Sequence, residues 1–271
     1  MKEFDINVIK EKLEKLKKIV RSKKMLAIAF SGGIDSSILA KVAHGELKNN
    51  AIAITLDSDV FAEKDLTFSI KIAKEIGIKH IIIKHTKLDD PIFIENSENR
   101  CFQCKNGEIY LVEKTAREYG IENIAYGVNT SDNNEHRPGI RALKEAGIFF
   151  PLEEAGIGKP EIPQIAKYLG LSNWGMPSTT CLASRIPYGK KIDIKKLTQI
   201  EDAEKFLSKF GVSDSRVRHH GDIARIEIPP NEIDKITFNK IEIVKKLKEL
   251  GFKYITLDLQ GYRSGSMNEV I

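Results

Sequence analysis

Short apolar runs alternate with amphipathic segments along the first two thirds of the chain. Four runs predict strands, at residues 25–30, 51–56, 79–84 and 123–127. The first three contain little polar alternation, as expected of strands that are covered on both faces. Strands that alternate with helices predict a parallel sheet with right-handed crossovers. In such a sheet, ligands bind beyond the carboxyl ends of the strands.

The segments between these runs have the spacing of amphipathic helices. The chain opens with a lysine-rich helix, whose apolar stripe consists of Ile6, Ile9, Leu13, Leu16 and Val20. Such spacings of three and four place the side chains on one helix face. Further helices are predicted at about 62–76, at about 106–119 and around 162–169, followed by Gly77, Gly120 and Gly170. A glycine at this position commonly ends a helix.

The pattern changes near Pro187. A helix at about 193–210, strands at 215–220 and 223–228, helical segments within 231–250 and a strand at 254–259 follow. Gly221-Asp222 is a turn signal between the two short strands. We therefore predict an α/β fold with a doubly wound parallel sheet over residues 1–186, and a smaller C-terminal α+β domain over residues 187–271.

Composition narrows the class of protein only slightly. The chain has 271 residues, 41% hydrophobic and 30% charged, which is typical of a soluble globular protein. Its net charge of +5 is compatible with an anionic ligand but too small to indicate nucleic acid. No apolar run reaches membrane length, and the charged N-terminal residues do not resemble a signal peptide. We expect a cytoplasmic protein that does not bind membranes.

The segment Ser31-Gly32-Gly33-Ile34-Asp35-Ser36-Ser37 follows the first predicted strand and precedes a predicted helix. A turn of this kind exposes unpaired N–H groups and the positive end of the helix dipole, so it favours an anion. The glycines allow close approach to a phosphate, and Ser31, Ser36 and Ser37 add hydroxyl donors. Asp35 would repel phosphate unless Mg²⁺ bridges the two groups. The alternative is an N-cap and tight turn without a ligand.

Three cysteines form the second group of candidate residues. Cys101 and Cys104 make a CxxC pair, and Cys181 lies far along the chain. Two thiolates at this spacing can bind one metal centre, and three suit an iron–sulfur cluster with one iron free of protein ligands. The alternatives are three buried free thiols, a zinc site completed by a histidine such as His136, and a redox pair.

Residues 31–36, SGGIDS, resemble the pyrophosphate loop of the ATP pyrophosphatase (PP-loop) superfamily. The resemblance implies a doubly wound sheet over about residues 20–185. It also implies that ATP is cleaved between its α and β phosphates, that AMP is placed on a substrate oxygen, and that this loop holds the departing pyrophosphate. Residues 127–132, GVNTSD, resemble a second ATP-side segment, in which Gly127 and Asp132 would contact nucleotide or metal. The alternative for this segment is a polar loop.

Four later segments resemble a narrower group. They are RCFQCK (100–105), CLASRIPYG (181–189), RVRHHGDIARIEI (216–228) and GYRSGSMNE (261–269). Together they are similar to the LarE family, ATP-dependent sulfur-inserting enzymes that build the nickel-pincer nucleotide cofactor of lactate racemase. The resemblance implies that a carboxylate of pyridinium-3,5-biscarboxylic acid mononucleotide is adenylated and then converted to a thiocarboxylate as sulfur displaces AMP. It also implies a homo-oligomer.

The family has two branches that differ in cysteine content. One branch has a single cysteine, matching Cys181, which gives up its own sulfur and becomes dehydroalanine. This sequence resembles the other branch, in which three cysteines, here Cys101, Cys104 and Cys181, hold a [4Fe-4S] cluster that can deliver an extra sulfide. The resemblance leaves the source of that sulfide open.

An anionic mononucleotide requires cationic partners. Arginine forks suit phosphates and carboxylates, and Arg185, Arg216, Arg218 and Arg263 lie in the family-like segments. We expect these four to bind substrate, with Arg185 first among them because it lies four residues from Cys181. We expect Asp35, Cys181 and Arg185 to be catalytic. Each arginine could instead belong to an internal ion pair.

Three other functions compete with this prediction. The first is a tRNA thiolation enzyme of the same superfamily, although the sequence has no separate RNA-binding module and no strongly basic stripe. The second is an ammonia-using ligase similar to NAD synthetase or an amidotransferase, in which the three cysteines have no role. The third is a non-catalytic ATP-binding protein that stores metal.

Overall fold

The computed structural model describes residues 5–134, 138–177, 179–263 and 265–269. Contacts divide the chain into two compact units. The first comprises Met1–Ser58, Glu63–His85 and Asn99–Thr179, and the second comprises Asp59–Ala62, Thr86–Glu98 and Thr180–Ile271. The domain boundary expected at residue 187 stays a prediction; by contacts, the second unit begins at Thr180 and includes two earlier segments.

A four-stranded parallel sheet forms the centre of the first unit, with the strand order β3-β2-β1-β4. The strands are β1 (Leu26–Ala29), β2 (Ala51–Ser58), β3 (Lys79–His85) and β4 (Ile124–Ala125). Leu26, Ala27 and Ile28 of β1 are fully buried, because β1 lies inside the sheet with helices on both faces. The predicted parallel sheet is confirmed.

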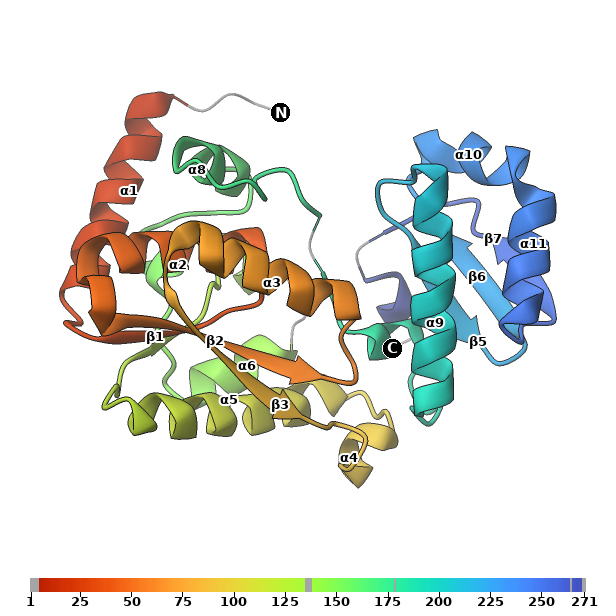
Figure 1. Ribbon diagram of the computed structural model, residues 1–271, viewed down its shortest axis with the longest axis horizontal. Helices are drawn as coiled ribbons and strands as arrows, with labels where there is room; N and C mark the ends of the chain where they lie inside the picture. The colour runs from red at the N-terminus through yellow and green to blue at the C-terminus, as the bar shows by residue number, and fades with distance from the viewer. Residues whose placement is uncertain (1–4, 135–137, 178, 264, 270–271) are drawn as a thin grey trace. The chain divides into compact units, whose positions relative to one another are not determined.

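Helices cover both faces of this sheet, as a doubly wound fold requires (Figure 1). One face packs against α1 (Ile6–Arg21), α2 (Ile34–Leu47), α3 (Glu63–Ile76) and α8 (Ile162–Tyr168). The other packs against α5 (Arg100–Glu118) and α6 (Pro138–Glu145). Alternate strand residues point to opposite faces, so Ile28 joins the first core and Ala27 the second.

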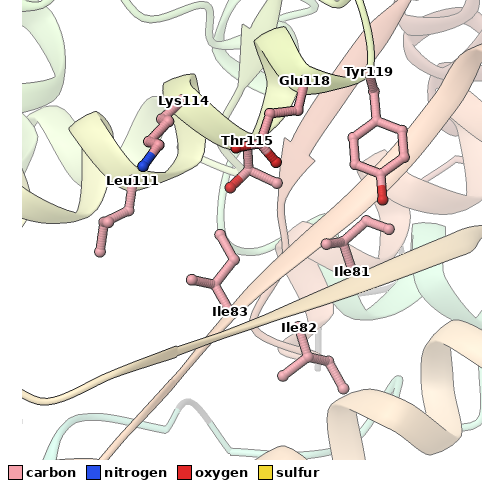
Figure 2. Close-up of a pocket in the computed structure, with 8 residues that line it drawn as sticks. All are labelled: Ile81, Ile82, Ile83, Leu111, Lys114, Thr115, Glu118 and Tyr119. Carbon is pink, nitrogen blue, oxygen red and sulfur yellow. The ribbon is translucent and has the colours of Figure 1, made fainter.

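Two expectations about this unit are corrected. The run at 79–84 was expected to be covered on both faces, but β3 is an edge strand and Ile82 is 40% exposed. Figure 2 shows Ile81 and Ile83 on the side of β3 that faces α5, and Ile82 on the opposite side. The helix predicted from about residue 106 begins at Arg100; its start was missed because Phe102 alone, among residues 100–105, packs against the apolar core and one residue shows no helical period. Cys101 and Cys104 therefore lie inside the helix.

The second unit contains a three-stranded sheet with the order β5-β6-β7. Strand β5 (Arg216–His220) pairs antiparallel with β6 (Ile223–Glu227) around the predicted Gly221-Asp222 turn, and β7 (Tyr254–Leu257) pairs parallel with β6. Helices α9 (Ile194–Leu207), α10 (Ile233–Phe238) and α11 (Lys240–Glu249) pack on the face that carries the core residues Val217, Ala224 and Ile226. Strand alternation therefore places Arg216, Arg218 and Arg225 on the other face.

The remaining elements are short. They are α4 (Pro91–Ile94), α7 (Pro151–Glu154) and 3-10 helices at Lys48–Asn50, Thr130–Asn134, Leu182–Arg185, Ser208–Phe210, Pro230–Glu232 and Ser266–Asn268. In the described part of the chain, no helix has both the length and the apolar character that a membrane span requires.

Candidate functional site

The segment 31–37, called the loop 31–37 below, comprises the turn after β1 and the first residues of α2, and lies at the carboxyl end of β1 as predicted. Helix α2 begins at Ile34 with Gly33 as its N-cap residue, and Gly33 has no side chain with which to cap the helix. Gly32 has φ +76°, and a Cβ there would lie 2.8 Å from the Cα of Ser69 in α3. Only glycine fits this position, because both the backbone angle and the contact exclude a side chain.

Serine hydroxyls fix the shape of the loop 31–37. The Ser36 hydroxyl donates to the Gly33 carbonyl at 3.0 Å, and the Ser37 hydroxyl donates to the same oxygen at 2.9 Å. The Gly33 N–H donates to Ser31 Oγ at 3.2 Å. Ser36 and Ser37 are buried, whereas Ser31 is exposed. Since the first N–H groups of a helix have no partner within it, the start of α2 is suited to an anion beside Ser31.

Replacing Gly32 by alanine is expected to distort this loop. A positive φ strains a non-glycine residue by about 1–3 kcal/mol, and the new methyl group would press on the α3 backbone. We expect a lower melting temperature together with weaker ATP binding, measured by thermal unfolding and calorimetry. Gly45→Ala in α2 is the matched control, because a Cβ at Gly45 meets nothing within 4 Å. Unchanged ATP affinity in Gly32→Ala would contradict a ligand role for the loop.

The segment 127–132 lies against the start of α2. The Asn129 side chain donates from Nδ2 to Asp35 Oδ1 at 2.8 Å. A Cβ on Gly127 would lie 2.9 Å from the Ser36 nitrogen, so the two backbones are in close contact. Asp132 is buried, and its carboxylate accepts from the Asn129 N–H at 3.0 Å. The structure thus brings Asp35 together with the second predicted segment, and adds Asn129, which sequence reasoning quoted within the motif but did not select.

A buried polar chain supports the residue before the loop. The Thr55 hydroxyl donates to the Phe30 carbonyl at 2.6 Å and lies 2.7 Å from His80 Nε2. Because that hydroxyl proton is used, the imidazole must be the donor to Thr55. Burial lowers the pKa of His80, which favours the neutral ring. No sequence motif pointed to these hydrogen bonds, since Phe30 follows β1, Thr55 lies in β2 and His80 lies in β3.

Cys101 and Cys104 lie in the first two turns of α5, and both are half-buried. Residues three apart lie on one helix face, so the two thiols can serve one centre. Arg100 Nη2 donates to Cys101 Sγ at 3.6 Å, and the Cys104 thiol donates to Glu108 Oε1 at 3.4 Å. Cys181 belongs to the second unit, where it precedes the 3-10 helix Leu182–Arg185.

No group of three or more His, Cys, Asp and Glu side chains is arranged to hold a metal ion among the residues that the structure describes. His136, the histidine considered for a zinc site, lies outside those residues. The predicted cluster ligands Cys101, Cys104 and Cys181 therefore stay a prediction.

A cationic lysine lies beside the CxxC pair. Lys105 forms an ion pair with the buried Glu108, and its Nζ lies 5.6 Å from the ring centroid of Tyr126. Burial lowers the pKa of Lys105, but Glu108 and Tyr126 outweigh it and the net pKa is raised. Burial also raises the pKa of Tyr126. Lys105 therefore stays protonated next to Cys104, and Glu108 is its ion-pair partner.

Arg185 has its donors occupied within the second unit. Its Nε and Nη2 donate to Glu204 at 3.0 and 3.1 Å. Its Nη1 donates to the Thr180 carbonyl at 2.9 Å and to the Cys181 carbonyl at 3.1 Å. Burial lowers the pKa of Arg185, but the charge of Glu204 outweighs it and the pKa is raised. Arg185 therefore fixes the backbone at Cys181, and its predicted contact with substrate stays a prediction.

The C-terminal segment 261–269 brings the other three arginines together. Arg218 pairs with the fully buried Glu227 at 2.7 Å and donates to Ser266 Oγ at 3.1 Å. Arg216 pairs with Asp214 and stacks 5.1 Å from the Tyr262 ring centroid. These contacts place both buried guanidinium groups beside the segment that contains Arg263.

Arg263 is the most accessible of the four arginines. It pairs with Glu269 at 3.1 Å, and its side chain is 31% exposed. Arg225 shares the sheet face with Arg218 and pairs with Glu227 at 3.0 Å. Sequence reasoning did not select Arg225, although it lies inside the quoted segment 216–228.

Similarity to known proteins decides the family. The family of NAD synthase matches residues 6–128. An uncharacterized protein of Synechocystis sp. is 38% identical over 266 residues, 97% of this chain and 99% of that protein. The pyridinium-3,5-bisthiocarboxylic acid mononucleotide synthase of Lactiplantibacillus plantarum is 35% identical over 251 residues, 91% of this chain and 90% of its own. The chain belongs to the LarE family.

Membership of the LarE family makes the chain an ATP-using sulfurtransferase of the PP-loop type. A more distant relative is the tRNA-specific 2-thiouridylase MnmA of Rickettsia peacockii, 26% identical over 185 residues, 54% of this chain and 50% of that protein. The NAD synthase match contains the loop 31–37 and the strands β1, β2, β3 and β4. The resemblance to the PP-loop superfamily and to the LarE family is therefore confirmed.

One hollow of this LarE-family chain lies apart from the residues discussed above. It has a volume of about 330 Å³ and lies between β3 and α5 (Figure 2). Its lining is Ile81, Ile82, Ile83, Leu111, Lys114, Thr115, Glu118 and Tyr119. None of the predicted site residues lines it, so we assign it no part in the reaction.

Proposed function

We propose that this LarE-family chain adenylates a carboxylate of pyridinium-3,5-biscarboxylic acid mononucleotide with ATP, releases pyrophosphate, and replaces an oxygen of that carboxylate with sulfur. The observation that carries the proposal is the contact of Asp35 with Asn129 at the start of α2, beside a loop in which only glycine fits at position 32. This contact joins the segments 31–37 and 127–132, the two that resemble ATP-binding segments of the PP-loop superfamily. The substrate follows from the name of the L. plantarum relative.

The chemistry requires stabilisation of a leaving group. A carboxylate is a poor electrophile, and adenylation provides AMP as the group that sulfur displaces. The pyrophosphate that leaves ATP gains negative charge, and the N–H groups at the start of α2 together with Ser31 suit that charge. Asp35 would hold Mg²⁺, which neutralises phosphate oxygens during the transfer. The half-buried carboxylate fits a hard cation that prefers oxygen ligands.

We assign Cys101, Cys104 and Cys181 to a [4Fe-4S] cluster. Support comes from the CxxC pair on one face of the first two turns of α5, with both thiols half-buried. A cluster with one open iron would supply sulfide for the carboxylate. In the protein itself, Arg185 fixes the backbone at Cys181 through the Thr180 and Cys181 carbonyls. The alternative is that Cys181 donates its own sulfur.

The arginines of the second unit are the proposed partners of the anionic mononucleotide. Arg216, Arg218 and Arg263 lie along β5 and the C-terminal segment, and Arg263 is accessible. We further propose a cytoplasmic homo-oligomer that binds neither nucleic acid nor membranes. The MnmA relative, which spans about half of this chain, represents the rival function, thiolation of tRNA.

The test is a reaction under anaerobic conditions. Protein with reconstituted iron and sulfide is incubated with ATP, Mg²⁺, sulfide and the biscarboxylic mononucleotide, and mass spectrometry follows the products. We expect a thiocarboxylate together with AMP and pyrophosphate. Thiolated tRNA in a parallel incubation, with an unchanged mononucleotide, would assign the chain to the rival function.

Arg263→Ala is expected to weaken binding of the mononucleotide. Losing one charge-assisted hydrogen bond costs about 1.5–3 kcal/mol, which corresponds to about a tenfold to hundredfold weaker affinity. Arg263 is the cleanest of the four arginines to replace, because its nearest partner Glu269 is exposed and its weaker partner Asp258 keeps an ion pair with Arg225. Calorimetry with the mononucleotide provides the measurement, and the exposed Arg117→Ala in α5 is the control. Equal affinities in the two variants would remove Arg263 from the substrate site.

A further inference from the structure

Asn173 is a buried asparagine whose side chain reaches the loop 31–37. Its side chain donates from Nδ2 to the Gly32 carbonyl at 2.8 Å and to the Ser37 hydroxyl at 2.9 Å. Asn173 is 0% exposed, and its Oδ1 is buried without a hydrogen-bond partner among the described residues. A carbonyl oxygen can only accept, so the contact with Gly32 fixes which end of the amide faces the loop.

The unpartnered Oδ1 indicates that Asn173 is retained for its donors. Leaving a buried acceptor unsatisfied costs about 1–3 kcal/mol. Leucine or valine would fill a core position in this place without that penalty, since the neighbouring Leu171 belongs to the apolar core. Both donated hydrogen bonds go to the loop 31–37, so the side chain stabilises the conformation of that loop.

The Gly32 carbonyl controls the direction of the next N–H group. In a trans peptide, the carbonyl and the following N–H point in opposite directions. The Gly32 oxygen is held by Asn173 Nδ2 and, at 3.3 Å, by the Ser37 hydroxyl. The Gly33 N–H is therefore directed away from the buried Asn173 and toward the exposed Ser31, to whose Oγ it donates at 3.2 Å, so a phosphate at Ser31 would share or replace that hydrogen bond.

We propose that Asn173 is a positioning residue, which orients the Gly32–Gly33 peptide so that the Gly33 N–H faces the β and γ phosphates of ATP. The proposal rests on the proposed function of the loop 31–37 as the pyrophosphate site. Asn173 holds the Gly32 carbonyl from a segment about 140 residues away. Affinity for pyrophosphate therefore depends on Asn173, whereas affinity for AMP does not.

Calorimetry with pyrophosphate and with AMP tests this proposal on the full chain in the presence of Mg²⁺. We expect Asn173→Ala to bind pyrophosphate about tenfold more weakly or worse, with AMP affinity within about twofold of wild type. Asn173→Ser keeps a small hydroxyl donor and serves if the alanine variant does not fold. Its affinity for pyrophosphate should lie between those of wild type and alanine.

Asn96→Gly is the matched control. Asn96 is also 0% exposed and also donates to backbone carbonyls, at 2.8 Å to Pro187 and Lys190, but it belongs to the second unit. Glycine suits its φ of +57°. The control should melt at a lower temperature and bind pyrophosphate as the wild type does.

The outcomes separate this proposal from the function on which it rests. A wild-type protein that binds neither pyrophosphate nor ATP would overturn both. Normal binding by the wild type with unchanged pyrophosphate affinity in both Asn173 variants would overturn the positioning role alone. Equal weakening for pyrophosphate and AMP would also overturn it, because a general loss of structure affects both ligands.

Discussion

Asp35→Asn is expected to bind ATP and to lose formation of AMP and pyrophosphate by about a thousandfold or more. The neutral amide is a much weaker ligand of Mg²⁺ than the carboxylate, so the charge that develops on the departing pyrophosphate is neutralised less well. The fold should survive, because an asparagine at position 35 can still accept the hydrogen bond that Asn129 Nδ2 now donates to Asp35 Oδ1 at 2.8 Å. Separation of AMP, ADP and ATP by chromatography provides the measurement.

Glu46→Gln on the same helix is the matched control for the loss of one carboxylate. Glu46 lies at the far end of α2 and pairs with Arg21 on the surface, so its replacement should leave turnover unchanged. Two results would contradict the assignment of Asp35. One is wild-type turnover in Asp35→Asn, and the other is ADP as the nucleotide product of the wild type.

Replacing any one of Cys101, Cys104 and Cys181 by alanine is expected to abolish repeated turnover with sulfide. Each variant removes one of the three thiolates that the proposed cluster requires, and the chain contains no fourth cysteine. Bound iron should fall with activity in all three variants. Iron and sulfide analysis after anaerobic reconstitution, an absorption spectrum and product counts per protein molecule provide the measurements.

Gln103→Ala separates the loss of a thiol from disturbance of the helix. Gln103 is exposed and lies between the two cysteines in the first two turns of α5, so this variant should keep both iron and turnover. Sacrificial donation by Cys181 would leave a different product, a protein lighter by about 34 Da because the cysteine has become dehydroalanine. That mass change, with full activity in Cys101→Ala/Cys104→Ala, would overturn the cluster assignment.

The parts of the fold that local pattern determines were predictable from the sequence. Runs of apolar residues located β1 and β2, and glycines marked the ends of α3, α5 and α8. The same information located β3 but not its place at the edge of the sheet, because three consecutive isoleucines look alike at the edge and in the middle of a sheet. It failed at the start of α5, where residues 100–105 contribute a single core-packing residue, Phe102, and so show no apolar period.

In the candidate site too, the residues that a local sequence pattern marks were predictable, and those that act through distant contacts were not. The loop 31–37 was predictable because its glycines, serines and aspartate are contiguous. Asn129 belongs to the segment 127–132, which was identified from the sequence, but only Gly127 and Asp132 were selected from that segment. Asn173 and the Thr55–His80 pair were not predictable, because each acts on the loop from a distant part of the chain and no local pattern marks the contact. Ion pairing of all four selected arginines is likewise a property of the folded chain.

The order in which the ribosome makes this chain has a consequence for its second unit. Asn96 Nδ2 bonds the Pro187 carbonyl, 91 residues later, and the Val60 carbonyl accepts from the Leu182 N–H at 2.7 Å. At about 5–20 residues per second, the early segments wait on the order of ten seconds for these partners. A fragment synthesised from Thr180 onward would therefore lack two segments of its own unit, Asp59–Ala62 and Thr86–Glu98, and with them the partners of these hydrogen bonds.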